Sequence, residues 1–229
     1  MKYENIKEGV FLSRPNRFIA NVLVDGENCV CHVKNTGRCK ELLIKGAKVF
    51  LEESNNPLRK TKYDLVAVYK GDRLINMDSQ NPNKVFFEWV KQEKLIKDIT
   101  YIKPEYKYGN SRFDFYVENG EEKLFIEVKG VTLFREGKAL FPDAPTERGI
   151  KHLSELAKCR ADGYTAKVFF IIAADFDGNI TFTPNRAIGD SFADALNDAS
   201  VKGVEICAFD CSTGFDLLDV KEQVAVAIG

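Results

Sequence analysis

The chain has 229 residues, of which 45% are hydrophobic and 29% charged, and its formal net charge is −1. This balance is typical of a folded globular protein and excludes disordered and fibrous classes. The near-zero net charge excludes a molecule-wide field that attracts polyanions, so any nucleic-acid site must be a local basic patch. No apolar stretch approaches the ~20 residues of a membrane span, and the charged start MKYENIKEGVFL is unlike an export signal. We therefore expect a cytoplasmic protein with no membrane partner.

The six cysteines are expected to be free thiols. A chain of this size without an export signal does not need a disulfide framework. No two cysteines form a C-x-x-C pair and the chain has only two histidines, so a structural zinc site is not expected. The cysteines are Cys29, Cys31, Cys39, Cys159, Cys207 and Cys211.

Residues 1–80 are predicted to form a five-stranded β-barrel of the oligonucleotide-binding (OB) type. Short alternating or apolar runs are separated by turn signals such as Asp25-Gly26. Five short strands with a small helical insertion at 37–46 are typical of this barrel. The strands are expected at residues 10–24 (bent at its proline), 28–34, 47–53, 62–69 and 73–78.

Residues 81–229 are predicted to form a second domain, an α/β sandwich with a mixed sheet. The apolar period changes after residue 80, and Val85, Phe86 and Trp89 mark an amphipathic helix that ends near residue 99. The expected order is helix, three strands, helix, strand, helix, strand, which is typical of a sheet covered by helices. After the first helix the expected elements are a hairpin at 112–130, a turn at Glu136-Gly137, a helix between Pro145 and Gly163, a buried strand at 167–174, a helix at 191–201 and a strand at 204–209.

The segment RFDFYVENGEEKLFIEVKG, residues 112–130, is predicted to be a β-hairpin. Asn119-Gly120 is expected at its tip in a type I′ turn, because both residue types tolerate positive φ. This register places Glu118 opposite Glu121 and Asp114 opposite Phe125. Side chains alternate between faces along a strand. One face is expected to hold Arg112, Asp114, Tyr116, Phe125, Glu127 and Lys129, and the core face Phe113, Phe115, Val117, Leu124, Ile126 and Val128.

In this register Asp114 and Glu127 are diagonal neighbours, with Cα atoms roughly 7 to 8 Å apart. Two such carboxylates can reach one Mg²⁺ ion, which usually takes one or two carboxylates and keeps places for water and phosphate. Lys129 lies on the same face and is expected to orient a bound water or to stabilise a developing oxyanion. The pattern indicates phosphodiester hydrolysis.

The same pattern also fits an ordinary half-exposed sheet. A hairpin with one apolar and one charged face is common, and E-x-K occurs by chance in many strands. Tyr116 and Phe125 on the charged side indicate that this face is partly covered, and carboxylates in a cleft need a partner. The spacing alone leaves both interpretations open.

Several motifs together resemble the bacterial and archaeal sugar fermentation stimulation protein A family. They are RPNRF, NTGR, NPLRKTKY, YGNSRFDF, EVKGVTL and ALFPDAPTERGIKHLSEL, in order between Arg14 and Phe209. The resemblance implies an OB-type barrel followed by a restriction-endonuclease-like domain of the PD-(D/E)xK class. The family is described as DNA-binding and is implicated in regulating sugar (maltose) metabolism. Nuclease activity is implied only by the fold and the motif.

The resemblance assigns the site residues as follows. Asp114 matches the first acid of the motif, Glu127 the second and Lys129 its lysine, and the bound ion would be Mg²⁺ or Mn²⁺. Glu88 matches an acid that such nucleases often supply from the preceding helix, although it also fits a solvated helix face. The chain has Phe113 where the class name has proline, a position at which many members vary.

Basic residues in both halves are candidates for contacts with nucleic acid. Phe18 or Tyr63 would serve as a stacking surface, and Gly37 permits a turn whose N–H groups cradle an anion. Against this interpretation, the density of cations is near that of an ordinary surface. In the second half, Lys151 or His152 is a candidate for contact with a phosphate or an attacking water, although His152 also fits a solvated helix face capped by Thr146 or Asp143. The candidates are Arg14, Arg17, Lys34, Arg38, Arg59, Lys60, Lys62, Arg148 and Lys151.

The leading hypothesis is therefore a DNA-binding protein with a divalent-metal nuclease site. The alternatives are a non-catalytic DNA-binding regulator of sugar metabolism that keeps the nuclease fold, and a small-molecule or protein-binding adaptor. Restriction-type nucleases often work as dimers because two strands need two sites, so a homodimer is a further expectation.

Overall fold

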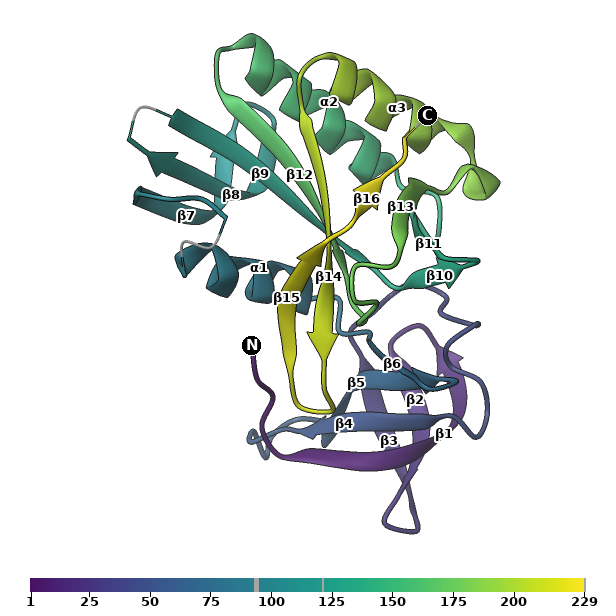
Figure 1. The fold of residues 1–229 in the computed structure, drawn as a ribbon. Helices are drawn as coiled ribbons and strands as arrows, with labels where there is room; N and C mark the ends of the chain where they lie inside the picture. Colours follow the sequence, from purple (N-terminus) through teal and green to yellow (C-terminus); the bar gives the residue numbers. More distant parts are fainter. Residues whose placement is uncertain (93–94, 121, 229) are drawn as a thin grey trace.

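The computed structural model describes residues 1–92, 95–120 and 122–228. Its N-terminal part is a closed five-stranded barrel in the order β3-β2-β1-β4-β5, closed by the parallel pairing of β3 with β5, and β6 extends the sheet beyond β5 (Figure 1). The predicted barrel is confirmed. Its strands are β1 (Ile6–Asn16), β2 (Ile19–Val24), β3 (Glu27–Val33), β4 (Lys48–Glu53), β5 (Tyr63–Lys70) and β6 (Arg73–Asn76).

The barrel differs from the prediction in two places. Residues 10–24, predicted as one bent strand, belong to two antiparallel strands, because the Asn16 side chain accepts the N–H of Phe18 (2.9 Å) and closes a tight turn. The helical segment predicted at 37–46 reduces to a single turn, in which Leu43 N–H donates to the carbonyl of Cys39 (2.9 Å). The predicted count of five barrel strands was right, but β6 is not one of them.

The rest of the chain is built on a six-stranded mixed sheet in the order β15-β14-β12-β9-β8-β7. The strands β9, β12 and β14 are parallel and the outer pairs are antiparallel. This confirms the predicted α/β domain with a mixed sheet. The strands are β7 (Ile99–Tyr108), β8 (Ser111–Asn119), β9 (Glu122–Val131), β12 (Thr165–Ile172), β14 (Glu205–Thr213) and β15 (Leu218–Gln223).

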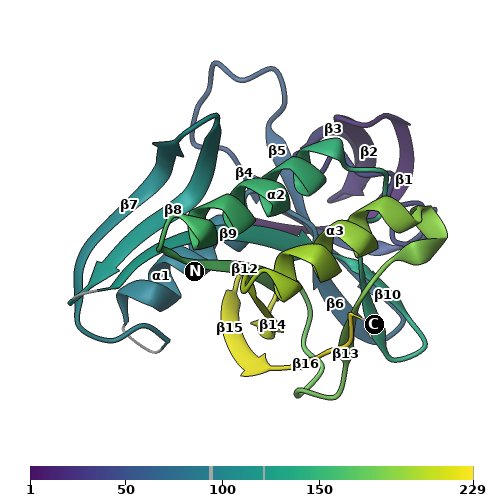
Figure 2. The ribbon, with the colours of Figure 1, turned by 90° about the horizontal axis from the view of Figure 1, so that it is seen from above.

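Helices cover both faces of this sheet. Helix α1 (Asn81–Lys91) lies on one face, and α2 (Glu147–Ala161) and α3 (Asp190–Val201) lie side by side on the other (Figures 1 and 2). The N-cap of α2 is Thr146, whose hydroxyl accepts the N–H of Gly149 (3.0 Å). The sheet is therefore buried on both sides, as the apolar run at 167–174 predicts.

Adjacent residues of β12 illustrate the two cores. The Phe169 ring centroid lies 4.7 Å from that of Phe86 on α1, while that of Phe170 lies 3.9 Å from Phe182 on the opposite face. A second, small sheet and one 3-10 turn complete the domain. The small sheet has the order β10-β11-β13-β16, with β10 (Leu133–Arg135), β11 (Lys138–Phe141), β13 (Thr181–Pro184) and β16 (Ala225–Val226), and the turn is η1 (Arg186–Ile188).

Four strands were not predicted: β7, β13, β15 and β16. Strand β7 is largely exposed at the edge of the sheet and has no regular apolar alternation. It carries Pro104, and Glu105 has a positive φ of 53°. Proline and irregular backbone are typical of edge strands because they discourage pairing with another chain.

Strand β6 joins the barrel to the second domain. The N–H of Asn76 donates to the carbonyl of Ala173 (2.9 Å) just beyond β12, and Ile75 forms a bridge with Ala174. The Arg73 guanidinium lies 3.9 Å from the centroid of the Phe176 ring. Backbone pairing therefore links the two parts directly. No helix among the described residues is long and apolar enough to cross a membrane.

A buried ion-pair network connects the barrel to the segment that leads into α1. Asp64 on β5 is 5% exposed and accepts both Arg59 and Lys34. Lys34 also lies 2.8 Å from Asp78, whose side chain is fully buried. Burial alone would raise the pKa of Asp64, but the hydrogen bond from Arg59 and the charge of Lys34 outweigh it and lower the pKa to about 2. Ionised Asp64 thus stabilises the folded state.

We expect Asp64→Asn to lower the free energy of unfolding at pH 7 by roughly 2 kcal/mol at most, since the pKa is depressed in the folded state. The contribution is complete above the ordinary pKa of about 3.8 and is lost as pH falls towards 2. Urea unfolding should therefore show the gap between wild type and variant shrinking to roughly half at pH 3. The exposed Asp72→Asn is the control. A gap of the same size at both pH values would contradict this account.

Candidate metal centre

The hairpin of β8 and β9 differs from the predicted register by two residues. Glu118 pairs with Lys123 and not with Glu121, which lies outside the described residues. The observed register puts opposite charges side by side, whereas the predicted one opposed two glutamates. Gly120 has the positive φ expected at the turn (57°), while Asn119 remains in the strand. A shift of two residues leaves each side chain on the same face.

The alternation of β8 breaks at Asp114. On the side away from the turn, the backbone pairing of β8 with β9 ends at Phe115 and Ile126. Asp114 and Phe113 therefore have no paired residue on β9. Phe113, expected on the same face as Phe115, instead lies with its ring centroid 5.2 Å from that of Phe125, in the core beneath α2. The predicted placement of Phe113 was wrong, because β8 departs from β9 at this point.

Asp114 fills the gap that this departure leaves. Its Oδ2 accepts the backbone N–H of Val128 on β9 (2.8 Å), and its Oδ1 accepts Nδ2 of Asn83 in the first turn of α1 (2.8 Å). Burial raises the pKa of Asp114, and the nearby charge of Glu127 raises it further. The carboxylate is thus fixed in position and needs a positive partner in order to stay ionised.

Glu127 is the buried member of the acid pair, with 2% of its surface exposed. Its Oε1 accepts hydrogen bonds from Lys129 Nζ and from His152 Nδ1 on α2. Burial alone would raise the pKa of Glu127, but the His152 hydrogen bond and the Lys129 charge outweigh it, so the pKa is lowered. Its Oε2 is buried with no hydrogen-bond partner. An oxygen of this kind calls for a cation or a donor.

The donor set fits a divalent ion of the magnesium type. Asp114 and Glu127 supply oxygen ligands, and the unpaired Oε2 of Glu127 is a free coordination point. Within the described residues, no group of three or more His, Cys, Asp and Glu side chains is arranged to hold a metal. Mg²⁺ commonly binds through one or two carboxylates and completes its shell with water and phosphate, so two acids suffice.

The structure places Asp114 close enough to Glu127 and Lys129 for their charges to act on it, whereas Glu88 lies apart from them. Glu88 lies on the exposed side of α1, and its Oε2 is 2.8 Å from the N-terminal ammonium of Met1. The α1 residue that reaches the site is Asn83, which the sequence analysis did not single out. Its only sequence signal is its place in the first turn of a predicted helix.

The contact between His152 and Glu127 was also not predicted from the sequence. The prediction weighed His152 against a solvated helix face, yet the side chain is 6% exposed and bonded to Glu127. Arg148 and Lys151 line an open pocket beside it, together with Arg112. These cations border the acid pair on the α2 side.

The predicted basic residues of the barrel differ in what they contact. Arg14 is a structural residue, because its guanidinium donates to the carbonyls of four residues and holds the loop after β3. Lys34 and Arg59 are paired with buried acids, so their charges are already balanced. Lys62 pairs with half-buried Glu53. The carbonyls that Arg14 binds belong to Arg17, Asn35, Gly37 and Arg38.

Two further predicted cations, Arg17 and Arg38, lie at one pocket of the barrel. Arg17, Arg38 and Lys40 line it with Arg14, and no carboxylate is among its lining residues. Lys60 is exposed on the loop before β5. Their contact with nucleic acid stays a prediction, and the pocket with Arg17 and Arg38 is the part of the barrel best suited to phosphate.

Without divalent metal, we expect Asp114→Asn to raise the melting temperature. The substitution removes a buried charge whose pKa is raised by burial and by Glu127, and the Asn83 amide can turn to meet the new side chain. The gain should vanish as the pH falls through the pKa of Asp114, because the wild-type carboxyl then gains its proton. Thermal unfolding in EDTA at several pH values measures this. Exposed Glu122→Gln on the same hairpin is the control, and a lower melting temperature for Asp114→Asn at neutral pH would refute the expectation.

Comparison with known proteins connects this geometry to a family. The family model "SfsA N-terminal OB domain" matches residues 12–77, and "Sugar fermentation stimulation protein RE domain" matches residues 80–216. Sugar fermentation stimulation protein homologs from Clostridium beijerinckii and Desulfitobacterium hafniense strain Y51 are 55% and 56% identical over 228 residues, covering 100% of this chain and 100% and 99% of theirs. A solved structure of Pyrococcus furiosus SfsA in complex with Ca²⁺ is 28% identical, with a TM-score of 0.89 over 99% of this chain and 98% of that one. The chain belongs to the sugar fermentation stimulation protein family.

Proposed function

We propose that this protein is a cytoplasmic, divalent-metal-dependent nuclease that acts on DNA. The observation that carries the proposal is the buried acid pair with an unpaired carboxylate oxygen, Oε2 of Glu127, beside the ammonium of Lys129. A buried unpaired oxygen is costly for a structural role alone. It is useful when an ion is to be bound there.

Asp114 and Glu127 would hold Mg²⁺ or Mn²⁺. When bound, such an ion supplies a Lewis acid for the phosphate and lowers the pKa of a coordinated water. The relative from Pyrococcus furiosus was solved with Ca²⁺, which supports a divalent-cation site in this family. Ca²⁺ and Mg²⁺ both favour oxygen ligands.

Lys129 supplies the fixed positive charge of the site. Its side chain is 18% exposed, so its ammonium lies at the boundary between the buried Glu127 and solvent. From there it can stabilise negative charge that develops on a phosphate oxygen. His152 holds Oε1 of Glu127 from the other side, which leaves Oε2 for the ion.

Two basic regions would position the DNA backbone. One is the pocket beside the acid pair, where Arg112, Arg148 and Lys151 outnumber the single lining carboxylate, Glu147, and the other is the barrel pocket with Arg17 and Arg38. Contacts of this kind position phosphates without reading sequence.

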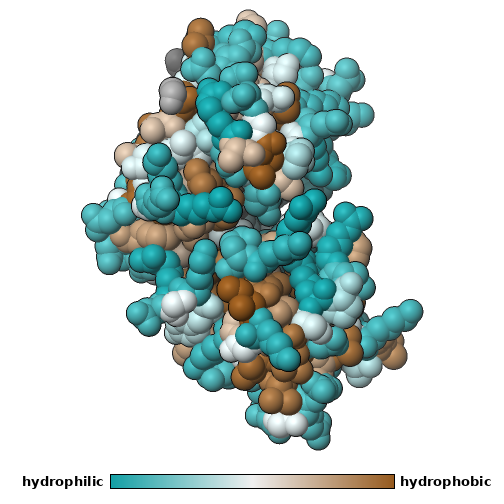
Figure 3. All heavy atoms as spheres, turned by 90° about the vertical axis from the view of Figure 1, so that its right-hand side faces the viewer, coloured by the Kyte–Doolittle hydropathy of each residue, from teal (hydrophilic) through white to brown (hydrophobic). Residues whose placement is uncertain are grey.

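Apolar surface on the barrel would add stacking. Figure 3 shows that hydrophobic residues gather over the barrel half of this face of the molecule. Phe18, on the barrel, is 45% exposed, and the Arg17 guanidinium lies 5.1 Å from its ring centroid. Exposed aromatic rings beside cations suit single-stranded nucleic acid, because bases stack on them. Strandedness is therefore part of the test.

The second candidate is a non-catalytic DNA-binding regulator of sugar metabolism. One observation favours it: Glu127 already pairs with Lys129 and is hydrogen-bonded to His152, contacts that also suit a purely structural role. Such a protein would bind DNA through the same basic regions and would not cut it.

We expect cleavage of DNA oligonucleotides that depends on Mg²⁺ or Mn²⁺ and falls about 10²-fold or more in Asp114→Asn and in Lys129→Ala. Labelled single-stranded and duplex substrates separated on gels give the rates. Glu88→Gln is the matched control and should cut as fast as wild type, since Glu88 contacts the N-terminus.

The outcomes separate the candidates. DNA binding without cleavage under any divalent metal would favour the regulator, and no binding at low salt would leave the adaptor. Loss of cleavage in Glu88→Gln would show that the acid pair has been wrongly chosen. Cleavage of both strands of a duplex would call for two copies, and light scattering on the DNA complex tests the proposed homodimer.

A further inference from the structure

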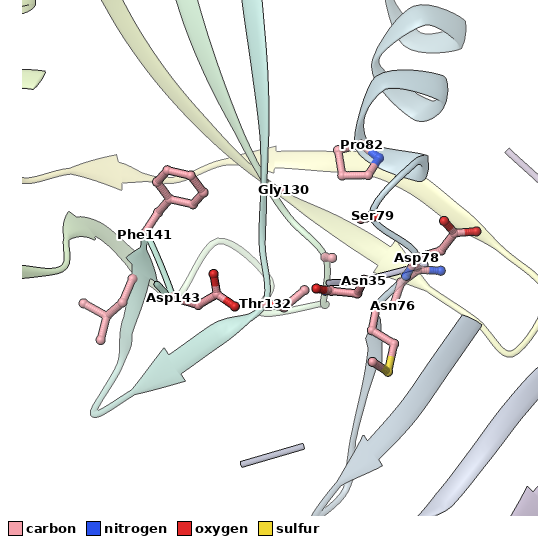
Figure 4. Close-up of a pocket in the computed structure, with 12 residues that line it drawn as sticks. Asn35, Asn76, Asp78, Ser79, Pro82, Gly130, Thr132, Phe141 and Asp143 are labelled. Atoms are coloured by element: carbon pink, nitrogen blue, oxygen red, sulfur yellow. The ribbon is translucent and has the colours of Figure 1, made fainter. Parts of the chain in front are cut away.

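A cavity of about 120 Å³ lies between the barrel and the α/β domain (Figure 4). Its walls come from the loop after β3, the segment between β6 and α1, the end of β9 and the segment after β11. At roughly 30 Å³ per water molecule, this volume is that of about four waters. Neither Asp114 and Glu127 nor any residue of the two basic pockets lines this cavity.

Several polar groups in the wall are committed to one another. Asn76 donates to the hydroxyl of Tyr3 (2.7 Å) and accepts the N–H of Asp78 (3.2 Å). Asp78 accepts Nζ of Lys34 (2.8 Å), and the hydroxyl of Ser79 donates to the Lys34 carbonyl (2.8 Å). These groups support the cavity and have little capacity left for a ligand.

Asp143, Thr132 and Asn35 form the open polar side of the cavity. The Asp143 carboxylate and the Asn35 side-chain oxygen point towards Thr132 from opposite sides (Figure 4). A Cβ on Gly37 would overlap Oδ2 of Asp143 and lie 2.9 Å from Oδ1 of Asn35, so both oxygens flank Gly37. Oδ1 of Asn35 already accepts the N–H of Gly37 (2.8 Å), which leaves its amide nitrogen as a donor.

The opposite side of the cavity is apolar. Phe141 and Pro82 stand above the polar row in Figure 4, and Met77 and Leu140 also line the cavity. A bare cation would need oxygen ligands on all sides. Apolar walls with a few polar groups are typical of an organic ligand. The chemistry therefore calls for a flat ring that carries N–H donors on one edge.

We propose that this cavity binds a guanine base of the nucleic acid and that Asp143 reads it; the proposal rests on the proposed action on nucleic acid and names the nucleotide. Guanine offers two adjacent donors, N1–H and the exocyclic amino group, to one carboxylate, and the Asn35 amide nitrogen can donate to its O6. Adenine, cytosine and thymine each offer one donor at that edge. Extruded bases are read by edge hydrogen bonds and by apolar packing in this manner.

The cavity is next to the basic pocket of the barrel. The loop that carries Asn35 presents Thr36 to Arg38 to the basic pocket of the barrel, and Ala144, next to Asp143, lines that pocket too. One wall thus separates the guanine site from a cluster of cations. A phosphate of the same nucleotide would reach those cations, which offset the negative charge of Asp143.

The opposite wall borders the acid pair. Gly130 and Pro82 line the cavity and touch, since a Cβ on Gly130 would lie only 2.6 Å from Cγ of Pro82. The residues next to them in the chain are Lys129 and Asn83, which contact Glu127 and Asp114. A base held in the cavity would therefore place a neighbouring phosphate towards the acid pair and fix where the strand is cut.

The test is a titration of the full-length protein with guanosine 5′-monophosphate, followed by NMR at low salt in EDTA, so that the acid pair takes no part. We expect shifts of the Thr132 and Phe141 signals, and binding about tenfold weaker for inosine 5′-monophosphate, which lacks the amino group. Adenosine and cytidine monophosphates should bind more weakly still. Equal binding of all four nucleotides, or no shift at these residues, would overturn the proposal without any need for a variant.

Asp143→Asn should weaken guanosine monophosphate binding about tenfold or more and abolish its preference over inosine monophosphate. Exposed Asp72→Asn on the barrel is the matched control and should bind like wild type. Unchanged guanine preference in Asp143→Asn would refute the assignment. The nuclease proposal is judged separately: guanine-selective binding without cleavage sinks the nuclease and keeps this site, whereas cleavage by a protein with no guanine preference does the reverse.

Discussion

The backbone N–H of Val128 donates to the side chain of Asp114 rather than to a neighbouring strand, and the candidate site depends on this hydrogen bond. The ladder between β8 and β9 ends at Phe115 and Ile126, so the next N–H on β9 would otherwise be unpaired in the protein interior. The carboxylate replaces the missing strand partner. An acidic side chain is thereby held close to Glu127 despite the repulsion that raises its pKa.

Two helices complete this arrangement from opposite faces of the sheet. Helix α1 supplies Asn83 to Asp114, and α2 supplies His152 to Glu127. The approach of α1 depends on Gly130, because any larger residue would meet Pro82 at the start of the helix. The same close contact forms the wall between the acid pair and the inter-domain cavity. Local packing thus fixes the site and its distance from the barrel together.

The sequence predicts the parts of this site that depend on strand periodicity and misses the parts that depend on tertiary approach. Glu127 and Lys129 could be placed on one face despite the register error, because a shift of two residues keeps faces unchanged. Asp114 was found from the motif, since the alternation of β8 breaks at that residue. The contact of Asn83 could not be found, since it arises only where α1 meets the sheet. Glu88 was chosen by resemblance, but on α1 it lies beside the N-terminal ammonium of Met1. Lys34 was predicted to contact nucleic acid, but it pairs with Asp64 and Asp78. These acids lie far from it in the sequence, so no local pattern reveals the pairing. Arg59 likewise pairs with Asp64.

The central claim is that Asp114 and Glu127 share one divalent ion. The most direct measurement is a crystal structure of the protein soaked in Mn²⁺, with anomalous diffraction to locate the metal. We expect one peak between the two carboxylates, roughly 2 Å from an oxygen of each, with Oε2 of Glu127 as the ligand on that side. The claim would be contradicted if Mn²⁺ peaks appeared elsewhere in the crystal, which would show that the soak worked, but none appeared between Asp114 and Glu127. Glu127 would then still be bonded only to Lys129 and His152.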